Sequence, residues 1–259
     1  MGRACQYTGM SDLAARPIAL LAERRNTISA RVYDRLREAI VTSEFKPGTR
    51  ISEADLAETL SVSRTPVREA FVRLFEEGLI EISPQTGTRV SLINPERVRQ
   101  AVFVRTSIEC TALRLHTQTP TERQIGDLGL SIEAQERGIE DGDFVQMYTQ
   151  DMRFHAQLLA AFGQPLAWNA CQFVSADMMR IGFLIGLDAR HLHQIVHEHQ
   201  GILAEVVKGD FEAAAQALAT HIRSVEIDQS TISGKDSVFF DAGKAKGEMG
   251  ERHLLRGRQ

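Results

Sequence analysis

The sequence predicts a mainly α-helical protein, in which an N-terminal winged helix-turn-helix is followed by an all-α antiparallel bundle of about six helices. Two observations predict this class. Before residue 94, three segments with helical spacing of apolar residues precede two short strand-like runs around a turn. After Asn94-Pro95, apolar residues recur at helical spacing to about residue 229, with short breaks between segments.

The composition is that of an ordinary globular chain. Of its 259 residues, 43% are hydrophobic and 25% are charged, and the net charge is −4, so any contact with DNA must come from a local patch. Its three cysteines, Cys5, Cys110 and Cys171, lack metal-binding spacing, which indicates a reducing setting. No secretory pattern occurs, and no apolar run reaches the roughly 18 residues of a membrane span. We therefore expect a cytoplasmic protein without membrane contact.

Four segments are expected along the chain. Residues 1–26 lack sustained periodicity and are predicted to be a flexible extension. The winged helix-turn-helix occupies residues 27–93 and the helical bundle residues 94–230. Residues 231–259 are rich in glycine and charge, which predicts a disordered tail.

In the front domain, the periodicity predicts helices from residue 29 to the stop at 46–48, over 52–60 and over 63–78, and strands over 79–82 and 89–92. Ser52 is the expected N-cap of the second helix. Gly78 is expected to end the third.

The third helix would place its N-terminal end, with Ser63, Arg64, Thr65 and Arg68, in the major groove of DNA. Arginine can bind guanine O6 and N7 or a phosphate, and hydroxyls and helix N-terminal amides bind phosphate oxygens. The alternative is an amphipathic helix with solvated arginines. The nine basic and ten acidic residues between positions 31 and 91 do not favour DNA binding by charge alone.

The segment GTRISEADLAETLSVSRTPVREAFVRLFEEGLIEISPQTGTRV resembles the DNA-binding domain of the GntR family of bacterial transcription regulators. VSRTPVREA, RL, EGLI and the glycine-centred wing occur in the family's order and spacing, and the resemblance covers about residues 29–92. It implies that Ser63, Arg64, Thr65 and Arg68 contact DNA. It also implies that the wing tip at Gly87 lies near the minor groove. Some relatives carry an arginine where this chain has Ala54, and Arg50 is a candidate substitute.

In the rear domain, Asp151 and His155 are four residues apart and therefore share one face of a helix. A carboxylate and a neutral imidazole together suit a divalent cation. Gly209-Asp210 divides residues 197–222 into a helical hairpin. His199 and His221 lie ten residues before Gly209 and eleven after Asp210, so each is about 15 Å from the turn, at similar height.

Alternatives to a metal site remain open at this point. The same four side chains could be polar residues that find partners in the core or at the surface. His193 and His197 form a competing pair four residues apart. His197 and His199 are about 200° apart around the helix axis, so both cannot serve one site.

The motifs DxxFH, EHxxIL and GDxxxAxxxxxxHI, within about residues 96–229, resemble the FCD effector domain of the FadR subfamily. The resemblance implies that Asp151, His155, His199 and His221 hold a divalent metal ion. Zinc is the first candidate, with nickel and manganese as alternatives.

The same resemblance implies that a small carboxylate effector binds at the open coordination positions of the ion. Arg105 matches an arginine that lines the pocket in similar proteins, and its alternative is an intrahelical ion pair with Glu109. His197 is a candidate for a hydrogen bond from the pocket wall.

Together these features predict a ligand-responsive repressor that binds a palindromic DNA operator as a homodimer and senses a small organic acid in a metal-assisted pocket. No metalloprotease, nucleophile-elbow, P-loop or dinucleotide motif occurs, so no enzyme is predicted. Two alternatives are a metal-free regulator of an acyl-CoA or other larger ligand, and a metallohydrolase with a vestigial DNA-binding domain.

Overall fold

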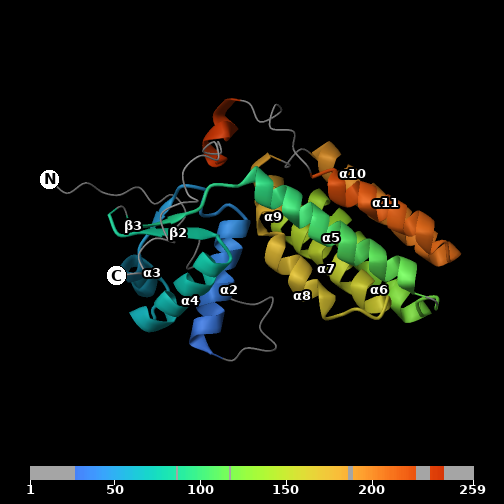
Figure 1. Ribbon diagram of the computed structural model, residues 1–259, viewed down its shortest axis with the longest axis horizontal. Coiled ribbons are helices and arrows are strands. Elements are labelled where there is room, and N and C mark those ends of the chain that lie inside the picture. The colour runs from blue at the N-terminus through green and yellow to red at the C-terminus, as the bar shows by residue number, and fades with distance from the viewer. Residues whose placement is uncertain (1–26, 86, 117, 186–188, 226–233, 242–259) are drawn as a thin grey trace, which may run out of the picture.

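The computed structural model describes residues 27–85, 87–116, 118–185, 189–225 and 234–241. Three helices and a small sheet form one end of the molecule, and a bundle of helices forms the other (Figure 1). The prediction of a mainly α-helical chain, with a winged helix-turn-helix before an all-helical domain, is confirmed. The predicted extension at 1–26 and most of the predicted tail lie outside the described residues.

The front domain is a three-helix core with a wing. Its elements are α2 (Ile28–Val41), β1 (Arg50–Ile51), α3 (Glu53–Thr59), α4 (Arg64–Glu76), β2 (Ile80–Ser83) and β3 (Gly87–Val90). Ser52 caps α3 by accepting from the amides of Ala54 and Asp55. The antiparallel sheet has the order β1-β3-β2. Strand β1 was not predicted, because two residues are too short to show an alternating pattern.

The rear domain contains seven helices within the described residues. They are α5 (Pro95–Leu115), α6 (Glu122–Glu140), α7 (Phe144–Ala161), α8 (Ala167–Val174), α9 (Ala176–Ile185), α10 (Ala189–Lys208) and α11 (Phe211–Arg223). The sequence predicts about six, because the break between α8 and α9 contains neither glycine nor proline. Ser175 makes this break, where its hydroxyl donates to Cys171 O at 2.6 Å.

Helix α9 joins the two domains. Ala176 at its start is buried in the front-domain core, whereas Met178 belongs to the rear core. Between them, Asp177 accepts from Arg180 Nη1 at 2.8 Å, and Arg180 Nη2 donates to the carbonyl of Ser91 in the linker. Asp177 and Arg180 are 1% and 0% exposed, so this ion pair is fully enclosed between the domains.

Arg97 of α5 ties the end of α4 to the same junction. Its guanidinium donates to the carbonyls of Glu77 and Gly78 at the end of α4 and lies 3.6 Å from Asp177 Oδ2. Gly78 has φ +68°, and a Cβ there would lie 2.0 Å from Arg97 Nη1. Glycine is therefore required both for the turn and for the close approach of Arg97.

Part of the predicted tail is ordered. Residues Gly234–Phe239 form the 3-10 helix η2. The end of η2 bonds the linker between the domains: Ile93 N donates to Phe239 O at 2.9 Å, and Asp241 N donates to Ile93 O at 2.8 Å. Phe240 is 7% exposed and joins the rear core. The expectation of disorder therefore does not hold for residues 234–241, which bond the linker at Ile93 and bury Phe240, while Val238 stays exposed.

We expect Asp177→Ala to destabilise the protein by about 3–5 kcal/mol, because it leaves the buried guanidinium of Arg180 without its carboxylate. Urea unfolding measures this change. Glu212→Ala, which breaks an exposed pair with Arg114 at 2.8 Å, is the control and should change stability little. Equal losses in the two variants would show that the junction does not depend on the buried pair.

Candidate metal centre and DNA-binding surface

Four side chains from three helices converge inside the rear bundle. Asp151 and His155 come from α7, His199 from α10 and His221 from α11, and one ligand atom of each lies within 4.8 Å of all the others. These are the four residues predicted as metal ligands. His155 and His199 are 0% exposed and His221 is 9% exposed. The helical hairpin of α10 and α11 therefore brings its two histidines to the same depth, as their distances from the turn require.

The three imidazoles meet through their Nε2 atoms. The Nε2 of His221 lies 3.1 Å from that of His199 and 3.3 Å from that of His155. Asp151 Oδ1 lies 3.5 Å from His199 Nε2. The four donor atoms thus face a common centre, and their N₃O composition suits a borderline divalent cation.

The opposite nitrogen of each ring has a partner from another helix. The Nδ1 of His155 lies 2.7 Å from a carboxylate oxygen of Glu109. The Nδ1 of His199 lies 2.8 Å from the amide oxygen of Gln135, and that of His221 lies 2.8 Å from a carboxylate oxygen of Glu198. Gln135 Nε2 donates to Gln150 O at 3.3 Å, which leaves its Oε1 as an acceptor. Carboxylate and amide oxygens only accept, so each Nδ1 carries the proton. A neutral ring protonated at Nδ1 directs an Nε2 lone pair inward, which is how metal-binding histidines are oriented.

The electrostatics of the cluster favour the neutral form of His155 and His199. Burial lowers the pKa of His155, aided by the charge of Arg105, and burial and the neighbouring rings lower the pKa of His199 well below its usual value. Burial would raise the pKa of Glu109, but Arg105 and His155 outweigh it and lower this pKa to about 2. His155 and His199 are therefore favoured as neutral rings, the form in which histidine binds a metal ion, and the ring of His155 is held by the ionised carboxylate of Glu109.

Arg105 of α5 lies beside this cluster and is 5% exposed. Its Nε donates to Glu109 Oε1 at 2.7 Å, which is the intrahelical pair expected as the alternative role. Its buried Nη2 has no hydrogen-bond partner in the described part of the chain, so one donor remains for a ligand. Burial opposes the charge of Arg105, but Glu109 and Asp151 outweigh it and raise the pKa of the guanidinium.

Sequence reasoning missed Gln135, Glu198 and Trp168. Trp168 of α8 lies parallel to the ring of His155, with 6.3 Å between centroids, and the Arg105 guanidinium carbon is 5.8 Å from the same tryptophan ring. Gln135 and Glu198 reach the cluster from other helices than the histidines they hold. Only the status of Trp168 as the single tryptophan marked any of the three in the sequence.

His197 does not join the cluster. It is exposed on α10, two residues before the buried His199, and the competing His193 is exposed as well. A rotation of about 200° for two residues places His197 on the opposite face of the helix. The predicted hydrogen bond from His197 to an effector is therefore corrected: its side chain points to solvent.

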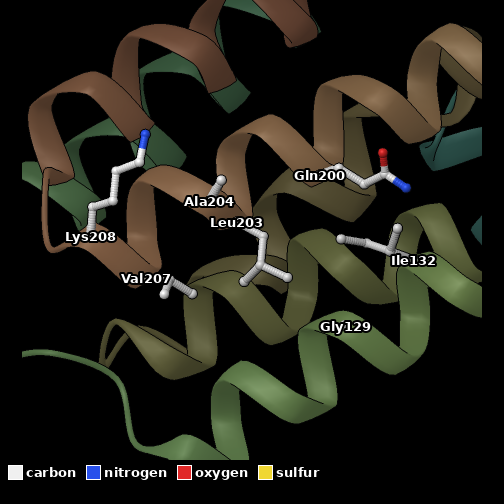
Figure 2. A pocket seen from close by; sticks show the side chains of 7 residues that line it. All are labelled: Gly129, Ile132, Gln200, Leu203, Ala204, Val207 and Lys208. Atoms are coloured by element: carbon white, nitrogen blue, oxygen red, sulfur yellow. The ribbon is translucent and has the colours of Figure 1, made fainter.

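A shallow apolar groove lies elsewhere on the bundle, between α6 and α10 (Figure 2). Ile132 lines it from α6, and Leu203 and Val207 line it from α10. None of the four clustered residues lines this groove, so it is separate from the candidate metal centre.

The predicted DNA contacts lie on the exposed face at the start of α4. Ser63, Arg64, Thr65 and Arg68 are all exposed. Ser63 is the N-cap residue of α4 but makes no side-chain cap hydrogen bond. The hydroxyl and the first amides of α4 therefore face solvent at the end of the helix with a positive dipole. Arg68 is oriented by Glu53, whose Oε2 lies 3.1 Å from its Nη2.

The other two predicted contacts lie on the wing sheet. Arg50 of β1 is exposed and pairs in register with Arg89 of β3. Gly87 begins β3 opposite Ser83, has φ +79° and is exposed at the hairpin turn. The structure therefore places Arg50 and Gly87 on the wing sheet, Arg64, Thr65 and Arg68 on α4, and Ser63 at the N-cap of that helix.

Among the described residues, every helix is too short or too polar to cross a membrane.

Comparisons with known proteins cover both domains. Residues 28–90 match the model of bacterial regulatory proteins of the gntR family, and residues 100–224 match that of the FCD domain. The chain is 30% identical over 213 residues to the HTH-type transcriptional repressor RspR of Escherichia coli K12, covering 82% of this chain and 93% of RspR. It is 30% identical over 201 residues to a probable D-xylose utilization operon transcriptional repressor of Paenarthrobacter nicotinovorans, covering 76% and 87%.

Solved structures show the same fold. Escherichia coli McbR/YncC matches with a TM-score of 0.67 at 21% identity, over 77% of this chain and 95% of that one. A GntR regulator from Rhodococcus sp. RHA1 matches with a TM-score of 0.65 at 26% identity, over 76% and 95%. The chain belongs to the GntR family of bacterial regulatory proteins, with the FadR-type order of a GntR helix-turn-helix and an FCD domain, and it is a transcription regulator and not an enzyme.

Proposed function

We propose that this regulator is a cytoplasmic, metal-dependent repressor that senses a small carboxylate and binds a palindromic operator as a homodimer. The observation that carries the metal dependence is the convergence of three Nε2 atoms and Asp151 Oδ1, with each Nδ1 held by an acceptor. Lone pairs that face one another at this distance repel unless a cation lies between them. Because the family consists of transcription regulators, the metallohydrolase alternative is set aside.

The donor set indicates which ion would bind and what remains open. Three imidazoles and one carboxylate suit zinc, and also nickel or manganese. On a six-coordinate ion the four protein ligands leave two positions, which a carboxylate can fill. The free Nη2 of Arg105 would bind an oxygen of the same carboxylate, since guanidinium binds carboxylates well.

The DNA reader is the exposed start of α4. Arg64 and Arg68 are four residues apart, so they share a face and can contact neighbouring bases or phosphates. Ser63, Thr65 and the α4 amides would bind phosphate, and Arg50 and Gly87 would place the wing beside the minor groove. One α4 reads only a few base pairs, so a homodimer on two half-sites supplies the specificity that an operator needs.

Coupling between site and reader would run through the domain junction. The effector binds on one side of α5, whose Arg97 holds the end of α4. A ligand that favours one packing of α5, α8 and α9 would shift the two readers of a dimer relative to their half-sites. The shift can be no larger than the ligand's differential affinity for the two packings allows.

We expect His199→Ala to lose the metal and His197→Ala to keep it. His199 places a buried Nε2 at the common centre, whereas His197 is exposed on the other face of α10. Metal content per chain is measured by elemental analysis after expression in zinc-supplemented medium. Equal zinc in the two variants, or none in the wild type, would contradict the proposed centre and favour the metal-free alternative with a larger ligand.

Arg68→Ala should weaken operator binding. If Arg68 contacts a base, the loss should be about 1–3 kcal/mol. If it contacts a phosphate, the slope of log affinity against log salt concentration should fall by about one. Fluorescence anisotropy on labelled operator at several salt concentrations measures both. Arg137→Ala is the matched control, because Arg137 is also an exposed arginine near a glutamate, Glu133, but lies on the rear domain. The role of Arg68 is rejected if both variants bind like the wild type.

Metal-loaded protein should release operator DNA when the matching organic acid is added, and a chelator should remove that response while leaving DNA binding of the ligand-free protein in place. A thermal-shift screen of small carboxylates identifies the acid, and a mobility-shift titration then measures release. Release that is unaffected by complete removal of the metal would refute metal-assisted sensing.

A further inference from the structure

One buried polar group near the metal centre has no assigned role. Tyr148 lies on α7 three residues before Asp151 and seven before His155, which places all three on one face of the helix. The residue is 6% exposed. Its hydroxyl is buried and has no hydrogen-bond partner among the residues that the structure describes. A buried tyrosine hydroxyl normally finds a partner, so this one needs an explanation.

The ring of Tyr148 is fixed by its neighbours. It packs on Phe183 of α9, with 4.5 Å between ring centroids. A Cβ at position 182 would lie 2.5 Å from the tyrosine oxygen, so Gly182 leaves the space that the hydroxyl occupies. The fit is therefore close around the ring, while the oxygen itself meets no acceptor. Phenylalanine would fill the same space without an unpaired group.

A second unpaired donor borders the same candidate centre. The buried Nη2 of Arg105 lacks a partner in the described part of the chain, like the Tyr148 hydroxyl. Arg105 and His155 both bond Glu109, and Tyr148 lies on the same face of α7 as Asp151 and His155, so both donors border the candidate centre. In agreement with this, burial and then the charge of Asp151 raise the pKa of Tyr148, and Asp151 is among the groups that raise the pKa of Arg105. Two unpaired donors beside the candidate metal ligands indicate a binding site for an oxyanion. The metal ion would be the third group that binds this oxyanion.

We propose that the Tyr148 hydroxyl is an effector-binding donor, which hydrogen-bonds an oxygen of the small carboxylate held by the metal and Arg105. This inference rests on the proposed function, because it assigns a further residue to the same site. In the ligand-free protein the unpaired hydroxyl lowers stability, and the effector offsets this by accepting its hydrogen bond. Tyr148 then favours oxyanions that place an oxygen at this point over ligands that leave the hydroxyl unpaired.

The test is Tyr148→Phe, with zinc-loaded protein and acetate and glycolate as probes. The variant removes one oxygen that has no partner, so the ligand-free protein should keep its zinc and should melt at the wild-type temperature or above it. Its dissociation constant for the bound acid should rise about 10-fold, as expected for one hydrogen bond to a charged acceptor. Fluorescence of Trp168, the single tryptophan, follows the titration beside His155.

Tyr33→Phe is the matched control. Tyr33 hydrogen-bonds Glu77 in the front domain, so its loss should lower the melting temperature without changing the affinity for the acid. The inference is overturned if Tyr148→Phe binds the acid as the wild type does, or if it melts lower with unchanged affinity, which would mark the hydroxyl as a structural group that holds buried water. If the zinc-loaded wild type binds neither acid, the proposed carboxylate sensing fails, and the role of Tyr148 fails with it.

Discussion

Three imidazoles that direct their Nε2 atoms at one point impose the main constraint on the rear domain. Such an arrangement persists only if the Nδ1 of every ring has a hydrogen-bond acceptor. Glu109 of α5, Gln135 of α6 and Glu198 of α10 are these acceptors. The ligands themselves come from α7, α10 and α11. Five helices are thus positioned by one buried polar cluster, in a bundle whose remaining core is apolar. Since a buried polar group without a partner costs free energy, the network also fixes how these helices pack.

Helix α5 connects this cluster to the DNA reader. Glu109 lies at the cluster, and Arg97, twelve residues earlier on the same helix, donates to the carbonyls of Glu77 and Gly78 just after α4. At 1.5 Å per residue these two points are about 18 Å apart along one rigid element. Helix α9 gives a second connection, because Asp177 accepts from Arg180 and contacts Arg97 in the enclosed junction. A displacement of α5 by a ligand would therefore be felt at the recognition helix without any loop having to transmit it.

Local patterns in the sequence were sufficient for the fold class, whereas the four clustered residues were singled out only when their spacing was combined with the resemblance to the FCD domain. The four-residue spacing of Asp151 and His155, and the equal distances of His199 and His221 from the Gly209 turn, contain the geometry of the cluster, because helices have a fixed rise and rotation. The rest depends on individual side-chain contacts, one of them local and one between distant segments. Ser175 ends α8 through a side-chain bond to Cys171 that competes with helix continuation, and Gln135 lies 64 residues from the histidine that it holds. Neither contact leaves a periodic trace in the sequence.

Arg105 shows why the two roles expected for it are compatible. A guanidinium has several donors, and the pair with Glu109 uses only Nε, which fixes the side chain while Nη2 stays free. The charges of Glu109 and Asp151 outweigh that of Arg105, so an incoming carboxylate would meet net repulsion at this point in the absence of a metal. A divalent ion reverses the local balance. The charge arrangement therefore makes anion binding conditional on the metal. Because Glu109 already neutralises the charge of Arg105, this arginine cannot attract a carboxylate without the ion.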